Sequence, residues 1–311
     1  MQNQDITNDQ LVDYNDNIIQ ETCDILDSFT AEERLDKALD NAMVFENSYF
    51  NTSLNKQSIL NEPKEPDETL IGLPRGEVGM LIAPGATGKS FFVLNLLLSS
   101  IGLAKNHLVT KPLKVLYLSL EDRLDDIERR LSNYKHALNI DQNKINSTTG
   151  DFDIVAYKGA QRLIERYDNS FVGQSALLTE FDSYIKNSKP DLVIIDTLIK
   201  TYGEGFDENS NPHMAQVLSH FNELAINNNC SIVLLHHTNK AAMNKDNEQS
   251  SSNSRGASSI VDNSRWVMSL QKVEKKYVTC SAVKVNFVAV NDCNYNFGHK
   301  GSLIMDSRYV A

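Results

Sequence analysis

The sequence predicts an α/β fold, with a mostly parallel sheet, helices on both of its faces and antiparallel strands at its C-terminal edge. Three observations predict it. From Glu77 onward, short continuous apolar runs alternate with longer helical stretches. The last stretch of the chain reads instead as strands joined by turns. Finally, 311 residues with 41% hydrophobic content suffice for one large core with an appendage.

The N-terminal part differs in composition from the rest of the chain. Residues 1–68 are rich in Asn, Asp, Gln and Glu and carry only isolated apolar clusters, which predicts a polar, acidic and flexible arm. The arm ends in "NEPKEPDETL", where two prolines among charges are typical of an extended linker. We therefore expect the ordered domain to span residues 69–311.

Within this domain the expected elements alternate along the chain. Helices are expected over residues 89–103, 124–136 and 174–187. Continuous apolar runs predict buried parallel strands at 78–83, 114–120, 191–196 and 230–237. The segments "WVMSLQKVEKKYVTCSAVKVNF" and "GSLIMD" predict antiparallel strands that extend one edge of the sheet.

Charge and cysteine content exclude several classes of protein. The formal net charge of −11 argues against a whole surface built for nucleic acid or anionic lipid, and leaves room only for a local basic groove. The four cysteines show neither zinc-site spacing nor the density of a disulfide scaffold. The sequence shows no signal-peptide pattern and no apolar run long enough to span a bilayer, so we expect a cytoplasmic protein without a membrane partner.

The stretch "APGATGKS", residues 83–90, has the pattern of a phosphate-binding loop between a strand and a helix. In such a loop backbone N–H groups surround a phosphate, a lysine neutralises phosphate oxygens, a hydroxyl ligates Mg²⁺, and the helix dipole adds to the same site. The first position holds Ala83, where glycine is usual. The predicted ATP-binding residues are Gly85, Ala86, Thr87, Gly88, Lys89, Ser90 and Phe91.

Three predicted strands end in residues suited to hydrolysis, at the carboxyl edge where ligands of such sheets bind. Glu121 follows "YLSL" and can orient or deprotonate water; the alternative is an acidic pair with Asp122 that caps the next helix. Asp196 ends "LVIID" and, with Ser90, is the predicted Mg²⁺ carboxylate, unless it only caps a helix. "VLLHH" ends in two histidines pointing to opposite sides, of which His237 is the predicted γ-phosphate sensor.

In order, "APGATGKS", "LSLED", "LVIIDT", "IVLLHH" and "SRGASSIVDNSRW" resemble the RecA-like hexameric ATPases, and among them the RepA-type plasmid replicative helicases, relatives of the DnaB-type helicases. The likeness covers roughly residues 70–305. It implies a RecA-like core, a homo-oligomeric ring of six subunits, Mg²⁺ and ATP as cofactors, movement along single-stranded DNA, and a replication initiator or primase as a possible partner. It also implies the same roles for Lys89, Ser90, Glu121, Asp196 and His237.

The resemblance adds two arginines to the site. Arg265 matches the arginine finger that reaches the γ-phosphate of a neighbouring subunit, a role that suits a delocalised guanidinium. Arg130 matches a position near the nucleotide base. The alternatives are that Arg265 is a surface residue beside Trp266, and that Arg255 is the finger or contacts DNA.

Two loops are expected to face the channel of such a ring. "TYGEGFDENSNPH" has acidic residues and no lysine or arginine, so by itself it does not indicate a DNA-binding surface. The loop after His237 carries the candidate DNA-binding residues Lys240, Lys245 and Arg255 among acidic ones; alternatively it is a disordered insertion without a partner.

Three functions are thus compatible with the sequence. The first is a DNA-translocating ring ATPase, a replicative helicase of a plasmid or similar mobile replicon. The second is a RecA-like regulatory ATPase whose cycle controls assembly or partner binding without strand separation. The third, a phosphotransferase, fits least well because the sequence has no arginine-rich lid to shield an acceptor from water.

Overall fold

The computed structural model describes residues 56–62, 65–166, 172–238, 260–273, 277–287, 294–300 and 303–306. The chain divides into two units, Met1–Lys64 and Glu65–Ala311. In the first unit the described part contains one short 3₁₀ helix, η1 (Lys56–Leu60). Most of the expected arm, residues 1–55, and the candidate DNA-binding residues Lys240, Lys245 and Arg255 lie outside the described residues.

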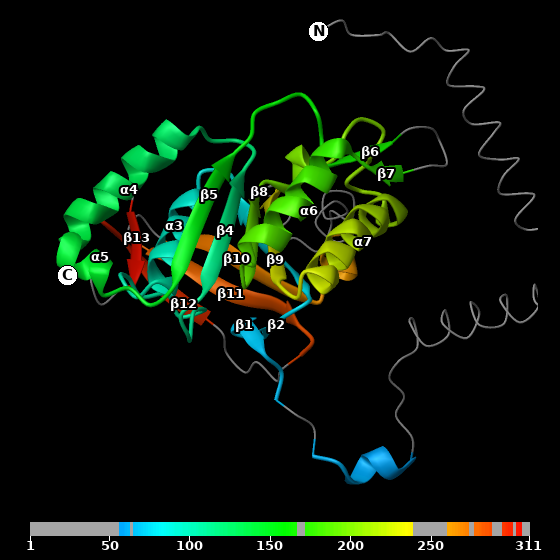
Figure 1. Ribbon diagram of the computed structural model, residues 1–311, viewed down its shortest axis with the longest axis horizontal. Coiled ribbons are helices and arrows are strands. Elements are labelled where there is room, and N and C mark those ends of the chain that lie inside the picture. The colour runs from blue at the N-terminus through cyan, green and yellow to red at the C-terminus, as the bar shows by residue number, and fades with distance from the viewer. Residues whose placement is uncertain are drawn as a thin grey trace, which may run out of the picture. The chain divides into compact units, whose positions relative to one another are not determined.

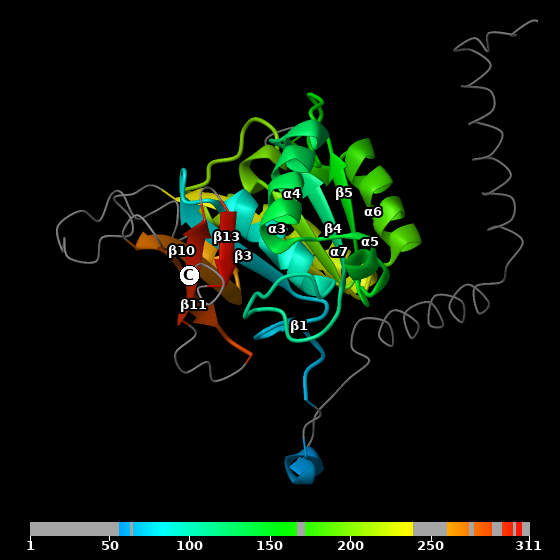
Figure 2. The same cartoon turned by 90° about the vertical axis from the view of Figure 1, so that its left-hand side faces the viewer.

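The second unit is built on a sheet that has nine strands within the described residues, in the order β13-β12-β11-β10-β3-β9-β8-β4-β5. From β5 to β10 neighbouring strands are parallel, and from β10 to β13 they are antiparallel. Figure 2 shows the antiparallel strands at one edge of the sheet, away from β5 and α6. The strands are β3 (Val78–Pro84), β4 (Lys114–Ser119), β5 (Asp151–Ala156), β8 (Leu192–Asp196), β9 (Ser231–Thr238), β10 (Trp266–Val273), β11 (Tyr277–Val285), β12 (Asn294–Lys300) and β13 (Leu303–Asp306).

Helices cover both faces of the sheet, as Figure 1 shows. On one face α3 (Lys89–Ser100) and α4 (Leu124–Leu138) share a core with strand residues such as Leu81 and Ile194. On the other, α6 (Ala176–Ser188) and α7 (Asn211–Asn227) pack on residues such as Met80 and Ile195. Successive strand residues alternate between the two cores, so both faces are buried and the runs are apolar throughout.

The remaining elements are short. They are the hairpin β1 (Glu68–Leu70) and β2 (Leu73–Pro74), the hairpin β6 (Ile164–Arg166) and β7 (Val172–Gln174), the helix α5 (Gln142–Asn146) and the 3₁₀ helix η2 (Leu198–Lys200). None of the helices in the described residues is both long and apolar enough to cross a membrane.

The structure confirms the predicted fold and corrects two of its details. β10, expected among the antiparallel strands, pairs parallel to β3, with Trp266 opposite Gly79, and only its other neighbour is antiparallel. The expected channel loop 201–213 ends in the first turn of α7, which begins at Asn211 with a proline in its first turn. The apolar spacing of α7, seen in Met214, Val217, Leu218 and Phe221, was a readable helical signal.

Candidate nucleotide site

The predicted phosphate-binding loop joins the carboxyl end of β3 to the amino end of α3. Gly88, at the helix N-cap, has a φ of 100°, and Ala86 has a φ of 61°. Thr87 folds the loop back, since its hydroxyl donates a 2.8 Å hydrogen bond to the carbonyl of Pro84. Such a turn before a helix directs free backbone N–H groups toward one point, which suits a phosphate.

Ala83, the residue in place of the usual first glycine, belongs to the extended strand β3 and pairs in register with His237 of β9. Its side chain is fully buried in the core shared with α3. A methyl group is therefore part of the packing at this position, and the extended backbone does not require glycine.

Lys89 is buried, and its ammonium group lies inside the loop. Its Nζ donates to the carbonyl of Ala83 at 3.3 Å and lies 2.7 Å from Nδ1 of His237. Burial lowers the pKa of Lys89, while the nearby charges of Asp196 and Glu121 act to raise it. The negative charge of a nucleotide phosphate would stabilise this ammonium group further.

Glu121 and His237 lie beside Lys89 at the same edge. Nε2 of His237 is 3.7 Å from Oε2 of Glu121, and both side chains are partly exposed. The two histidines of β9 do face opposite sides: His236 is buried and its pKa is lowered by burial, whereas His237 faces the loop. A carboxylate, an imidazole and an ammonium group thus meet where the terminal phosphate of a bound nucleotide is expected.

Asp196 and Ser90 form the predicted Mg²⁺ pair. The Ser90 hydroxyl donates to Oδ2 of Asp196 at 3.2 Å, and the hydroxyl of Tyr117 donates to the same oxygen at 2.9 Å. Burial is the main cause that raises the pKa of Asp196. A hydroxyl and a carboxylate are the oxygen ligands that Mg²⁺ prefers alongside phosphate and water, so these residues fit the ion.

Among the residues that the structure describes, His, Cys, Asp and Glu side chains form no cluster of three or more that could hold a metal ion by themselves. A Mg²⁺ ion at Ser90 and Asp196 therefore needs the oxygens of a phosphate, as is usual when a protein supplies only one or two ligands.

Tyr117 was not among the residues that the sequence singled out. It lies in the middle of β4 and is buried. Burial raises its pKa well above the usual value, so the phenol remains a hydrogen-bond donor. The available signal was a phenolic hydroxyl in the otherwise apolar run "VLYL", because a buried hydroxyl needs a partner.

Arg130, expected near the nucleotide base, lies on α4 with its guanidinium 5.5 Å from the centre of the Phe91 ring. It forms a bidentate ion pair with Asp122, which holds the side chain over the first turn of α3. Arg130 and Phe91 thus contact one another beside the loop. The position of Arg130 near a base and the contact of Phe91 with ATP stay predictions.

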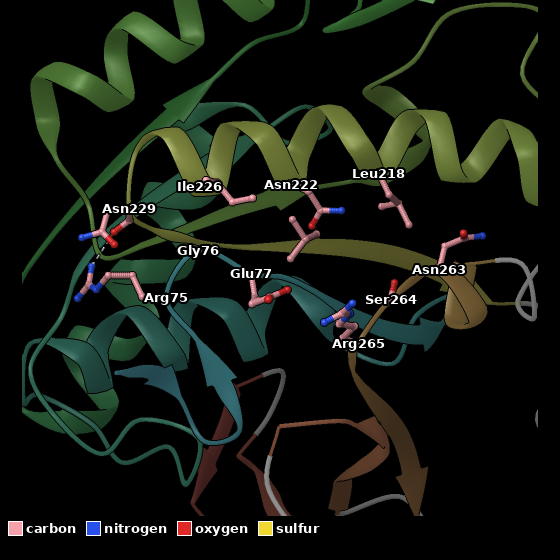
Figure 3. Close-up of a pocket in the computed structure, with 11 residues that line it drawn as sticks. Arg75, Gly76, Glu77, Leu218, Asn222, Ile226, Asn229, Asn263, Ser264 and Arg265 are labelled. Atoms are coloured by element: carbon pink, nitrogen blue, oxygen red, sulfur yellow. Dashed lines mark hydrogen bonds between the residues drawn. The ribbon is translucent and has the colours of Figure 1, made fainter. Parts of the chain in front are cut away.

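Arg265 lies away from all of these residues. It directly precedes β10, whose first residue pairs with Gly79 near the start of β3, whereas the loop follows the end of β3. The seven residues of β3 separate the two places by roughly 20 Å. Arg265 is exposed and lines a cavity of about 520 Å³ under α7, together with residues such as Glu77 and Asn222 (Figure 3).

Fold and loop together define a P-loop nucleotide-binding core. A protein-family model described as an AAA domain matches residues 50–243, more than half of the chain, and the chain belongs to this family. It is therefore a P-loop ATPase. The match includes the loop, Glu121, Asp196 and His237, and ends before Arg265.

Proposed function

We propose that this chain is a cytoplasmic ring ATPase, a homohexamer that translocates on single-stranded DNA as the replicative helicase of a plasmid or similar mobile replicon. The observation that carries the proposal is that the predicted catalytic residues are divided between the two ends of the parallel strands. Lys89, Glu121 and His237 lie together at the carboxyl ends of the strands, whereas Arg265 is exposed at the amino end of β10. Residues at opposite ends of the strands can complete one another only between copies arranged head to tail, and this arrangement forms a ring when its rotation closes.

Within the proposed site each side chain has a role that its surroundings support. Lys89 exchanges its contact with His237 for the phosphates, and Ser90 with Asp196 would hold Mg²⁺. When bound, Mg²⁺ supplies positive charge that neutralises the phosphate oxygens. Glu121 accepts the proton of the attacking water. The neighbour's Arg265 stabilises the charge that spreads over the transferring phosphoryl group.

His237 is the proposed link between hydrolysis and DNA. It contacts Lys89 and lies near Glu121, and β9 ends one residue later, at Thr238. The segment that follows contains Lys240, Lys245 and Arg255. Repeated around a ring, these three cations give a local basic surface on a chain whose net charge is −11. The expected DNA affinity is weak in the monomer and falls with rising salt.

The test compares basal ATPase, ATPase stimulated by single-stranded DNA and separation of a forked duplex in three proteins. Lys89→Ala should abolish turnover because it removes the charge that holds the phosphates. Neutralising Lys240, Lys245 and Arg255 together should remove DNA stimulation and leave basal turnover near that of the unmodified chain. Unchanged turnover in a folded Lys89→Ala protein would contradict the whole assignment.

A regulatory ATPase is the second candidate. It is favoured by the expected channel loop 201–213, which carries Glu204, Asp207 and Glu208 and no lysine or arginine. Glu208 is partly engaged there, as it accepts a 2.7 Å hydrogen bond from Tyr202. If the assembled protein hydrolyses ATP at low salt but shows neither DNA stimulation nor strand separation, this candidate replaces the helicase.

A further inference from the structure

We propose that Tyr117 is a positioning residue of the Mg²⁺ site: its buried hydroxyl fixes the orientation of the Asp196 carboxylate beside the Ser90 hydroxyl. The inference rests on the proposed assignment of Ser90 and Asp196 as the metal pair. It adds a residue on β4, the neighbour of the strand that ends in Asp196.

The sheet register brings the two side chains together. β4 and β8 are parallel neighbours, with Tyr117 opposite Ile194 and Ser119 opposite Asp196. Tyr117 and Asp196 are thus diagonal neighbours on one face, the face shared with α3, where Tyr117 and Ile194 belong to the same core. A phenol is long enough to reach the carboxylate along this diagonal, and the distance from its oxygen to Oδ2 is 2.9 Å.

Both partners of the Tyr117–Asp196 hydrogen bond are buried. Tyr117 and Asp196 are 1% and 2% exposed, so water competes little for either group. The ring lies in the middle of a buried strand, and a buried phenol retains its hydrogen-bond partner because an unpaired buried hydroxyl is unfavourable. The hydroxyl can therefore fix the carboxylate before any ligand arrives.

The distribution of donors on the carboxylate gives the orientation. Ser90 and Tyr117 each donate a side-chain hydrogen bond to Asp196, and both bonds end on Oδ2. The Ser90 oxygen is expected to bind the metal. The Tyr117 hydroxyl is not a proposed metal ligand, so it can keep its hydrogen bond to Oδ2. A fixed donor on Oδ2 holds the carboxylate in one orientation next to Ser90, as outer-shell partners of metal ligands do.

The test replaces Tyr117 by Phe, which removes one oxygen and preserves the volume of the core. Mn²⁺ affinity is measured by electron paramagnetic resonance in the presence of a non-hydrolysable ATP analogue. Tyr117→Phe should weaken Mn²⁺ binding about tenfold, the lower end of the usual range for outer-shell partners. The Mg²⁺ concentration for half-maximal ATPase should rise similarly, kcat at saturating Mg²⁺ should change by less than about twofold, and metal-free nucleotide affinity should stay the same.

Tyr134→Phe is the matched control. Tyr134 is an equally buried phenol whose hydroxyl bonds the backbone of Phe91 and Ile304. Its loss should lower the unfolding temperature and leave Mn²⁺ affinity unchanged. A second variant, Tyr117→Met, removes the hydroxyl with the ring and must show the same loss of metal affinity if the hydroxyl is responsible.

Unchanged Mn²⁺ affinity in the folded Tyr117 variants, or equal losses in the Tyr134 control, would overturn the proposal and leave Tyr117 a core residue. The Mn²⁺ affinity needs neither DNA nor a ring, so failure of the helicase assignment does not affect it. A wild-type protein that binds the nucleotide analogue but no metal would overturn both the metal pair and the role of Tyr117.

Discussion

At the scale of single residues, the site contains charged groups that are buried, and so poorly hydrated, before any nucleotide binds. Lys89 is buried against His237 and Ala83, and Asp196 is 2% exposed, with burial lowering the first pKa and raising the second. Both groups lose hydration, which a bound phosphate and a cation would replace. The loop is thus arranged for its ligand at some cost to the stability of the empty protein.

Asp196→Asn tests this trade-off. Asparagine keeps an oxygen that can accept from Ser90 and Tyr117 but removes the buried charge. We expect the free energy of unfolding at neutral pH, without nucleotide, to rise by on the order of 1 kcal/mol, and the stabilisation by Mg²⁺ with an ATP analogue to be lost. Urea unfolding with and without these ligands measures both effects.

The pH dependence has a defined sign. Because the pKa of Asp196 is raised in the folded protein, the native state binds more protons than the unfolded state between the ordinary carboxyl pKa and the raised one. Stability of the empty protein should fall with rising pH across that window, and less so in Asp196→Asn. A variant less stable than wild type at neutral pH would show that the carboxylate is a net stabiliser.

Glu121→Gln tests the base. Glutamine preserves shape and removes the group that accepts a proton, so ATP should still bind while turnover falls at least about a hundredfold, the usual contribution of general-base catalysis. Single-turnover hydrolysis and nucleotide titration separate the two quantities. Lost affinity with normal turnover of the bound fraction would make Glu121 a structural residue.

At the scale of elements, the junction of β3 and β10 joins the parallel and antiparallel parts of the sheet. Trp266 opens β10, is buried, and donates from Nε1 to the carbonyl of Ile71 at 2.9 Å. Its ring covers Gly79, where an added Cβ would lie 2.5 Å from Cε3 of the indole. The close approach of ring and backbone at this pair requires glycine in β3.

Gly79→Ala should therefore force the ring away from β3 and destabilise the protein by about 1–3 kcal/mol, as overpacked cores do. Thermal unfolding measures the loss. Gly203→Ala is the control, since the nearest atom to an added Cβ there is 3.9 Å away, and it should change stability by less than about 0.5 kcal/mol. Equal effects of the two substitutions would show that the indole ring of Trp266 can move away from position 79 without loss of stability.

At the scale of the whole molecule, the assignment of Arg265 depends on assembly. Arg265→Ala and Lys89→Ala proteins should each be inactive alone. In mixed rings, about a quarter of interfaces then pair an intact loop with an intact arginine if copies assemble at random in a head-to-tail ring. Up to roughly that share of wild-type ATPase should return, as measured after co-refolding or co-expression.

Absence of recovery in rings shown to be mixed would place Arg265 outside the neighbour's site and leave it a surface residue. The control mixes each variant with itself. Recovery there would mean that the substitutions do not inactivate the site, and the mixing result could no longer be attributed to shared interfaces.

The sequence by itself determined the features that depend on neighbouring residues. "APGATGKS" gave the turn between β3 and α3 because glycine and helix-start chemistry act over a few residues, and continuous apolar runs gave the buried strands because both faces of a parallel sheet are covered. The edge strand β5 was missed, since its residues are only partly buried and its pattern is weak.

Only the tertiary structure decided which distant residues meet. The hydroxyl of Tyr117 reaches Asp196 across 79 positions, and Lys89 reaches His237 across 148. The parallel register of β10 with β3, which separates Arg265 from the loop, likewise depends on pairing far along the chain. Such contacts are set by strand order and register, and these follow from how all the apolar faces pack at once, which no local pattern encodes.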